Sequence, residues 1–126
     1  MSPRTILVVD DESAVRRVVS RCIRAACPRY QVLEARDGLE ALSVVSPEVA
    51  LIVSDVNMPR LDGFELCRAV RSQDGPSREI PLILLTSRDG DADRETGAEA
   101  GATRYLTKPL DQAALNAALQ ELLGGD

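Results

Sequence analysis

Short runs of apolar residues alternate along this chain with longer stretches in which apolar residues recur every three or four positions. Runs of four to six apolar residues are typical of buried strands, and a period near 3.6 is typical of amphipathic helices. Strands and helices that alternate in this way favour βαβ units and a parallel sheet. The pattern therefore predicts an α/β fold with five strands and five helices.

The boundaries of these elements follow from the apolar pattern and from turn residues. The expected strands cover about Thr5–Asp10, Gln31–Glu34, Val49–Ser54, Pro81–Thr86 and Arg104–Thr107. The expected helices cover about Ser13–Ala26, Leu39–Val45, Phe64–Arg71, Ala92–Ala100 and Gln112–Leu123. Asp111 is a natural N-cap for the last helix, and Gly124 is a natural stop. The helix expected at Ala92–Ala100 has alanine as its only apolar residue type, so we expect low intrinsic stability there.

The order of the strands follows from how apolar each one is. The first, third and fourth strands are continuously apolar, as strands buried on both faces must be. The second alternates and the fifth is short, as edge strands tend to be. This favours a doubly wound, five-stranded parallel sheet of order 2-1-3-4-5, the flavodoxin-like (βα)5 fold. In this order the ligand crevice lies at the carboxyl ends of the first and third strands.

Four of the apolar runs end in a residue that can take part in chemistry. The first run is followed by Asp10 and Asp11, and the third strand is followed by Asp55. The fourth strand ends at Thr86, and the fifth is followed by Lys108. Because parallel strands joined by right-handed crossovers bring their carboxyl ends to one edge, we expect these side chains to meet.

Composition narrows the class of protein. A chain of 126 residues with 44% hydrophobic residues predicts one domain over residues 1–126. A net charge of −5 disfavours direct nucleic-acid binding by this domain, because neutralising phosphates needs a basic surface. No apolar run approaches the ~20 residues of a membrane span, and the first residues show no signal-peptide pattern. A cytoplasmic protein without membrane contact is expected.

Histidine and cysteine chemistry are both disfavoured. The chain has no histidine, which excludes histidine catalysis and histidine metal ligation within it. Its three cysteines, Cys22, Cys27 and Cys67, are odd in number and match no metal-ligand spacing. We interpret them as small hydrophobic side chains of a protein in a reducing compartment.

The residues at the strand ends are those that Mg²⁺-assisted phosphoryl transfer requires. Clustered carboxylates repel one another, and Mg²⁺ with its preference for oxygen ligands relieves that repulsion. A carboxylate can also attack phosphorus and form an acyl phosphate. Lys108 is the only lysine among fourteen arginines, and it is the obvious cation to neutralise a phosphoryl group. Thr86 can donate a hydroxyl hydrogen bond to a further phosphoryl oxygen.

Each of these residues also has an ordinary interpretation. Asp11 or Glu12 could cap the first helix. Asp55 could be a loop carboxylate, Thr86 a common strand-end residue, and Lys108 a solvated loop lysine. The combination favours a functional site, because four separate strand ends each carry the group that this chemistry needs.

Five segments that span the chain resemble the receiver domains of two-component response regulators. They are ILVVDDE at 6–12, DGLEAL at 37–42, LIVSDVNMPRLDGFEL at 51–66, PLILLTS at 81–87 and GATRYLTKPL at 101–110. The resemblance implies that Asp55 accepts a phosphoryl group from a phosphohistidine on a histidine kinase or histidine phosphotransfer protein. It implies that Asp11, Asp55 and the backbone carbonyl of Asn57 bind Mg²⁺ directly, and that Asp10 acts through a metal-bound water.

The resemblance also implies a switch. Lys108 would pair with the phosphoryl group, Thr86 would move to bind it, and Tyr105 would rotate into the space that Thr86 leaves. The surface formed by the last two helices and the last strand would change, for a downstream protein target or a covalently linked effector domain. The Lys108–Pro109 peptide would be cis.

Two other functions compete with this one. A Mg²⁺-dependent phosphatase that turns over external substrates usually has a general acid two residues after the nucleophile, and Asn57 cannot transfer a proton at neutral pH. A docking module that is never phosphorylated is expected to have lost some of the five site residues, and this chain keeps all five.

Several arginines depart from the family pattern or leave alternatives open. Arg60 stands where small residues are common. Arg88 either adds a positive contact near the phosphoryl group or is merely solvated. A basic stripe on the first helix either docks an acidic partner or is a solvated face; its members are Arg16, Arg17, Arg21 and Arg24.

Overall fold

The computed structural model describes residues 4–87 and 91–124. Its strands are β1 (Thr5–Val9), β2 (Gln31–Ala35), β3 (Val49–Asp55), β4 (Leu82–Thr86) and β5 (Arg104–Thr107). Its helices are α1 (Ser13–Ala26), α2 (Gly38–Val44), α3 (Gly63–Arg71), α4 (Asp91–Ala100) and α5 (Gln112–Leu123), with a 3₁₀ helix η1 (Pro76–Glu79). The bounds of the five strands and five α-helices lie within one residue of the predicted ones, and η1 lies in a segment for which no helix was predicted. Proline at its first position, with φ already fixed, favours this extra turn.

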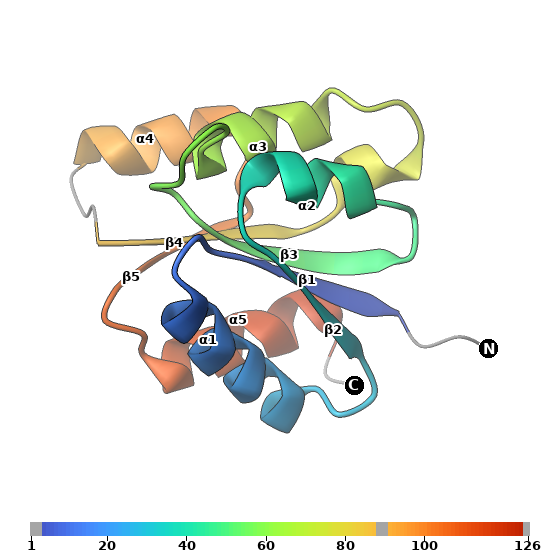
Figure 1. The fold of residues 1–126 in the computed structure, drawn as a ribbon, viewed down its shortest axis with the longest axis vertical. Helices are drawn as coiled ribbons and strands as arrows, with labels where there is room; N and C mark the ends of the chain where they lie inside the picture. Colours follow the sequence, from blue (N-terminus) through green and yellow to red (C-terminus); the bar gives the residue numbers. More distant parts are fainter. Residues whose placement is uncertain (1–3, 88–90, 125–126) are drawn as a thin grey trace.

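The five strands form one parallel sheet in the order β2-β1-β3-β4-β5. Helices α2, α3 and α4 cover one face, and α1 and α5 cover the other (Figure 1). Each face has its own buried cluster of aliphatic side chains. The prediction of a doubly wound, flavodoxin-like α/β fold is confirmed.

The burial of each strand follows from its place in the sheet. Every residue of β3 and β4 is buried, and so is every residue of β1 after Thr5. Strand β2, at the edge, alternates between exposed and half-buried positions before it ends at the buried Ala35. Continuous apolar runs therefore mark the strands that have a helix layer on both faces.

Helix α1 is buried along a narrow face only. Val19 and Ile23 are buried, but Val18 is 51% exposed and Ala14 and Ala26 are exposed. The helix packs mainly against β1, β2 and α5. An apolar strip on the outside of α1 is left uncovered by the described residues.

The helix ends agree with the capping residues seen in the sequence. The Asp111 side chain accepts hydrogen bonds from the backbone N–H groups of Ala113 and Ala114, and Gly124 ends α5 in the left-handed conformation. Cys27 and Cys67 are buried, Cys22 is half-buried, and all three are free thiols. Arg88, for which a contact with the phosphoryl group was one alternative, lies outside the described residues. None of the described helices is both long and apolar enough to cross a membrane.

Candidate functional site

The strand register brings the reactive side chains to one edge of the sheet. Val9 of β1 pairs with Ser54 of β3, so Asp10 and Asp55 follow at the same level on neighbouring strands. Thr86 pairs with Thr107, and Lys108 follows directly. The expected convergence of strand ends is therefore present.

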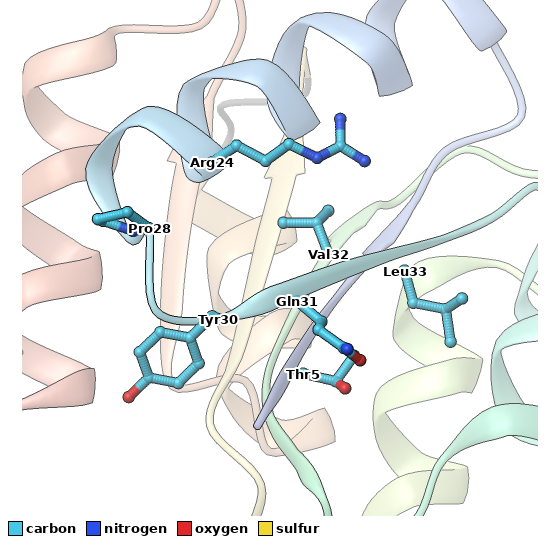
Figure 2. Close-up of a pocket in the computed structure, with 7 residues that line it drawn as sticks. All are labelled: Thr5, Arg24, Pro28, Tyr30, Gln31, Val32 and Leu33. Carbon is cyan, nitrogen blue, oxygen red and sulfur yellow. The ribbon is translucent and has the colours of Figure 1, made fainter. Parts of the chain in front are cut away.

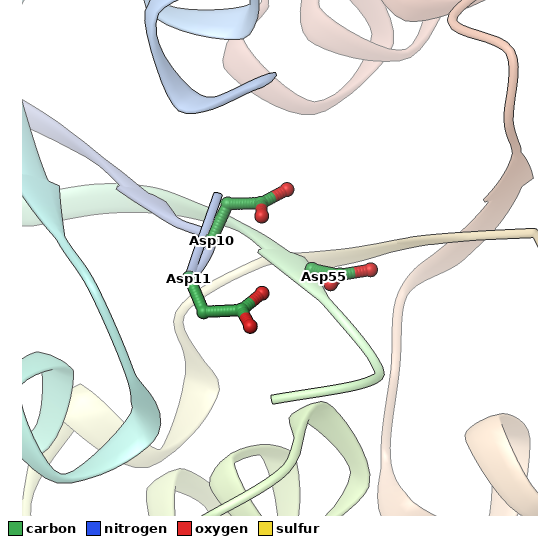
Figure 3. Close-up of side chains that lie close together, drawn as sticks. All are labelled: Asp10, Asp11 and Asp55. Carbon is green, nitrogen blue, oxygen red and sulfur yellow. The ribbon is translucent and has the colours of Figure 1, made fainter. Parts of the chain in front are cut away.

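Three carboxylates form the centre of this edge. Asp10 and Asp11 extend from the end of β1, Asp55 extends from the end of β3, and all three point to the same side (Figure 3). One carboxylate oxygen from each lies within 4.8 Å of the others. Asp10 and Asp55 are 2% and 6% exposed, whereas Asp11 is exposed. Carboxylate oxygens of two buried acids and one exposed acid are therefore close enough together to contact one ion.

Local hydrogen bonds fix the orientation of Asp10. Its Oδ1 accepts from the backbone N–H of Glu12 at 2.9 Å, and the Arg16 side chain donates to its carbonyl oxygen at 2.8 Å. Arg16 also pairs with Glu34 of β2 at 2.8 Å, so this member of the basic stripe is engaged within the fold. Glu12 is the N-cap residue of α1 and makes no side-chain capping bond. In this structure the acidic run after β1 supplies the site, and the N-cap side chain does not cap the helix.

Lys108 joins the two buried acids. Its Nζ lies 3.2 Å from Asp55 Oδ1 and 3.4 Å from Asp10 Oδ2. Its backbone N–H donates to the Thr86 carbonyl at 2.7 Å, which ties the end of β5 to the end of β4. The peptide bond between Lys108 and Pro109 is cis, as the family resemblance implied.

Burial and charge shift the titration of these groups. Burial, followed by the neighbouring charge of Asp10, raises the pKa of Asp55 above its ordinary value. Burial also raises the pKa of Asp10, against the opposing effects of the Glu12 N–H and of Lys108. Burial alone would lower the pKa of Lys108, but the charges of Asp55 and Asp10 outweigh it and the pKa is raised. Burial therefore disfavours the ionised form of both acids even with Lys108 beside them.

The donor set fits a hard divalent cation. The carboxylate cluster offers only oxygen ligands, and Mg²⁺ is commonly held by one or two carboxylates and several waters. Three acids against one ammonium leave an excess of negative charge that such an ion would neutralise. Asn57, whose carbonyl was predicted to complete the set, lies in the exposed part of the loop after β3.

Thr86 and Tyr105 lie on the same face of the sheet. Thr86 is fully buried at the end of β4. Tyr105 pairs with Leu84 in the register, two positions before Thr86, and side chains two positions apart share a face. The Tyr105 ring packs toward α4: the Arg94 guanidinium lies 5.1 Å from its centroid, and a Cβ on Gly97 would lie 3.0 Å from the ring. Sequence reasoning missed this packing of Tyr105 against α4.

Among the hollows on the described surface, two differ clearly in their position relative to the acidic site. One of about 510 Å³ lies beside the edge strand β2, at the amino end of the sheet, where Arg24 and Tyr30 border it (Figure 2). It contains no carboxylate and lies away from the acidic site. A second hollow of about 310 Å³ is almost wholly apolar and lies next to the site. Its lining residues are Ala14, Val15, Val18, Val19, Leu85, Lys108, Pro109 and Leu110.

Comparison with known proteins agrees with the fold. Residues 6–120 match the response regulator receiver domain family. The chain is 42% identical over 124 residues to the response regulator MprA of Mycobacterium sp. (strain KMS), covering 96% of this chain and 51% of that protein. It is 40% identical over 124 residues to a probable transcriptional regulator, ycf27, of Cyanophora paradoxa, covering 98% of this chain and 49% of that protein. The chain thus spans about half the length of these relatives.

Solved structures show the same architecture. The chemotaxis protein CheY4 of Vibrio cholerae superposes with a TM-score of 0.84 at 36% identity, covering 94% of this chain and 98% of that one. The receiver domain of the sensor histidine kinase PA1611 of Pseudomonas aeruginosa gives a TM-score of 0.84 at 32% identity, covering 96% of this chain and 98% of that one. That structure is described with a magnesium ion coordinated in its active-site cleft.

Proposed function

Because this chain belongs to the response regulator receiver domain family, we propose that it is a phosphorylation-controlled switch of a two-component phosphorelay, with Asp55 as the phosphoacceptor. The observation that carries the proposal is the cluster of Asp10, Asp11 and Asp55 with Lys108 in contact with two of the three acids. A histidine kinase or histidine phosphotransfer protein is the proposed donor. The output passes to a protein target or to a linked effector domain in the cytoplasm, without direct contact of this domain with nucleic acid or membrane.

The chemistry assigned to Asp55 is a single displacement. A carboxylate oxygen attacks phosphorus, an O–P bond forms, and the N–P bond of the phosphohistidine breaks. The leaving imidazole nitrogen keeps the bonding pair. Lys108, 3.2 Å from Asp55, is placed to pair with a phosphoryl oxygen, and Thr86 would donate its hydroxyl to another. Positioning and charge neutralisation supply most of the catalysis in phosphoryl transfer.

Mg²⁺ is the proposed cofactor, and it would neutralise charge on the phosphoryl oxygens. Asp11, Asp55 and the Asn57 carbonyl would bind it directly. Asp10 would act through a water, which agrees with its Oδ1 already accepting a hydrogen bond from the Glu12 N–H.

The switch would run from Thr86 to the surface of α4, β5 and α5. The hydroxyl of Thr86 moves toward the phosphoryl group, and the ring of Tyr105 on the same sheet face fills the space it leaves. The contacts of Tyr105 with Arg94 and Gly97 support this route, because a change of the ring alters the packing of α4.

The alternatives are weaker on chemical grounds. Asn57 offers no acid two residues after Asp55, which disfavours a phosphatase acting on external substrates. A docking module without phosphorylation has no need for Lys108 in contact with two buried acids.

The test of the proposed function uses acetyl phosphate, which transfers its phosphoryl group by the same displacement with acetate leaving. We expect the intact mass of the wild-type protein to rise by one phosphoryl group with Mg²⁺ and to stay unchanged with excess chelator. A protein that gains no phosphoryl mass with Mg²⁺ is better described as a docking module. One that releases phosphate continuously with no change in its own mass is better described as a phosphatase.

The apolar hollow beside Lys108 is the proposed docking surface of the phosphohistidine partner. Its wall contains Lys108 itself, so a partner seated there is adjacent to Asp55. Val18, half-exposed on α1, lines it. A helix with an apolar face flanked by acidic residues fits this surface, because Arg17 and Arg21 are exposed on the same helix.

Val18→Asp is expected to slow phosphotransfer from the cognate partner about tenfold or more, because a partner seated on this surface would bury an unpaired carboxylate, at a cost of about 1.4 kcal/mol or more. Phosphorylation by acetyl phosphate is expected to be unchanged, since the small donor needs no docking surface. Val44→Asp is the matched control, because Val44 is 36% exposed on α2, which covers the other face of the sheet. Equal transfer rates for the two variants would place the docking surface elsewhere.

A further inference from the structure

A strained turn lies in the loop that follows β3. Arg60 has a φ of 70° and is the only non-glycine residue with positive φ among the described ranges 4–87 and 91–124. The backbone N–H of Leu61 donates to the Pro59 carbonyl at 2.8 Å, so Arg60 is the centre of a γ-turn. γ-turns with a positive central φ are rare and strained. A residue with a Cβ stays in such a conformation only when the surrounding structure holds it there.

An ion pair supplies that restraint. Arg60 Nη2 lies 2.8 Å from Asp37 Oδ2, with side chains 55% and 8% exposed. The other oxygen of Asp37 accepts from the backbone N–H of Glu40 at 2.8 Å and so caps α2. The Glu40 hydrogen bond and, to a smaller extent, Arg60 hold the pKa of Asp37 below its ordinary value. One ionised carboxylate thus ties the strained turn to the start of a helix.

The turn also touches α2 through its backbone. A Cβ on Gly38, the first residue of α2, would lie 2.6 Å from the Leu61 carbonyl oxygen. At the base of the loop the Gly63 N–H donates to the Val56 carbonyl at 2.8 Å. The loop is therefore closed at its base and fixed at its tip, and Asn57 lies between these two points.

We propose that Arg60 is a positioning residue, which through its ion pair with Asp37 sets the conformation of the 56–63 loop and thereby the direction of the Asn57 carbonyl. The inference rests on the proposed function in one respect, that this carbonyl is a ligand of the Mg²⁺. A loop backbone that is already fixed favours Mg²⁺ binding, because less conformational freedom is lost when the ion binds. Here a side chain in a neighbouring segment, 23 positions earlier in the sequence, fixes it.

The test compares Arg60→Ala, Arg60→Gly and Asp37→Asn in the full chain. Asparagine caps helices as well as aspartate does, so Asp37→Asn removes the ion pair and keeps the cap. Glycine accepts a positive φ without strain, so Arg60→Gly removes the ion pair and also the need for it. Arg29→Ala, which removes an exposed arginine before β2 at the opposite end of the sheet, controls for the loss of one positive charge.

Two measurements are made on each protein: exchange of the 57–62 backbone amides without metal, and Mg²⁺ affinity from amide chemical shifts. We expect faster loop exchange and about two- to fivefold weaker Mg²⁺ binding in Arg60→Ala and Asp37→Asn, the range expected for a half-exposed ion pair. Arg60→Gly should have a loop exchange rate and a Mg²⁺ affinity between those of these variants and the wild type. The Arg60→Ala/Asp37→Asn double variant should bind Mg²⁺ no more weakly than either single variant.

The outcomes separate this inference from the proposed function. If the wild type binds Mg²⁺ and both ion-pair variants match Arg29→Ala in exchange and in affinity, the role of Arg60 is overturned and the switch function stands. If the wild type binds no Mg²⁺, the metal assignment and this inference fail together.

Discussion

Asp55→Asn is expected to abolish phosphoryl uptake from acetyl phosphate, with no added mass detectable under conditions that phosphorylate the wild type. The substitution keeps the shape of the side chain and removes the nucleophilic oxygen, since an amide does not attack phosphorus. Asp55 is the acid that contacts Lys108 at 3.2 Å and lies in the crevice between β1 and β3. Of the other two acids, Asp10 lies slightly farther from Lys108, at 3.4 Å, and Asp11 is exposed to solvent.

The matched control for this variant is Asp62→Asn. Asp62 caps α3 through a capping box with Glu65, and asparagine preserves such a cap. This variant loses one carboxylate near the same loop and should gain phosphoryl mass as the wild type does. Phosphoryl mass on Asp55→Asn, mapped by peptide analysis to Asp10 or Asp11, would assign the acceptor to a different carboxylate.

Asp55→Asn also has an expected effect on folding. Asp55 is buried beside Asp10, and two like charges close together in a poorly solvated site destabilise the metal-free fold. Removing one of them should raise the melting temperature in the absence of Mg²⁺. Greater stability together with lost phosphorylation distinguishes a functional acid from a structural one.

The sequence predicted the acidic site well because that site depends on strand ends. Asp10, Asp55, Thr86 and Lys108 each follow a recognisable apolar run, and a parallel sheet of order 2-1-3-4-5 leaves little choice about where those ends meet. The strand bounds could be wrong by a residue without changing the result. Register and crossover handedness together bring these side chains to one edge.

Contacts between loops and helices could not be predicted in the same way. The Arg60–Asp37 ion pair joins two segments with no periodic pattern. It depends on a positive φ at Arg60, and an arginine in a sequence does not indicate a positive φ. The exposure of Val18 depends on how much of α1 the sheet and α5 cover, which a helical period does not show. Both features arise from tertiary packing, where one-dimensional patterns carry little information.

Gly63 is the glycine whose replacement should disturb the site most. A Cβ at this position would lie 2.4 Å from the Asp55 carbonyl oxygen and 2.8 Å from the Val56 Cα. Both atoms belong to the backbone, so no side chain can rotate away from the clash. Either the start of α3 or the end of β3 must shift, and the end of β3 carries Asp55.

Gly63→Ala is therefore expected to lower the free energy of unfolding by about 2–4 kcal/mol, measured by chemical denaturation, because overpacking against fixed backbone is among the costlier single substitutions. The folded fraction should also show slower phosphoryl uptake, since Asp55 is displaced relative to Asp10 and Lys108. Gly124→Ala is the control: Gly124 has a φ of 76° with no atom within 4 Å of the added Cβ, so only the backbone penalty of about 1–2 kcal/mol applies. A Gly63→Ala protein as stable as Gly124→Ala, with a wild-type rate of phosphorylation, would mean that α3 and the loop before it adjust independently of Asp55.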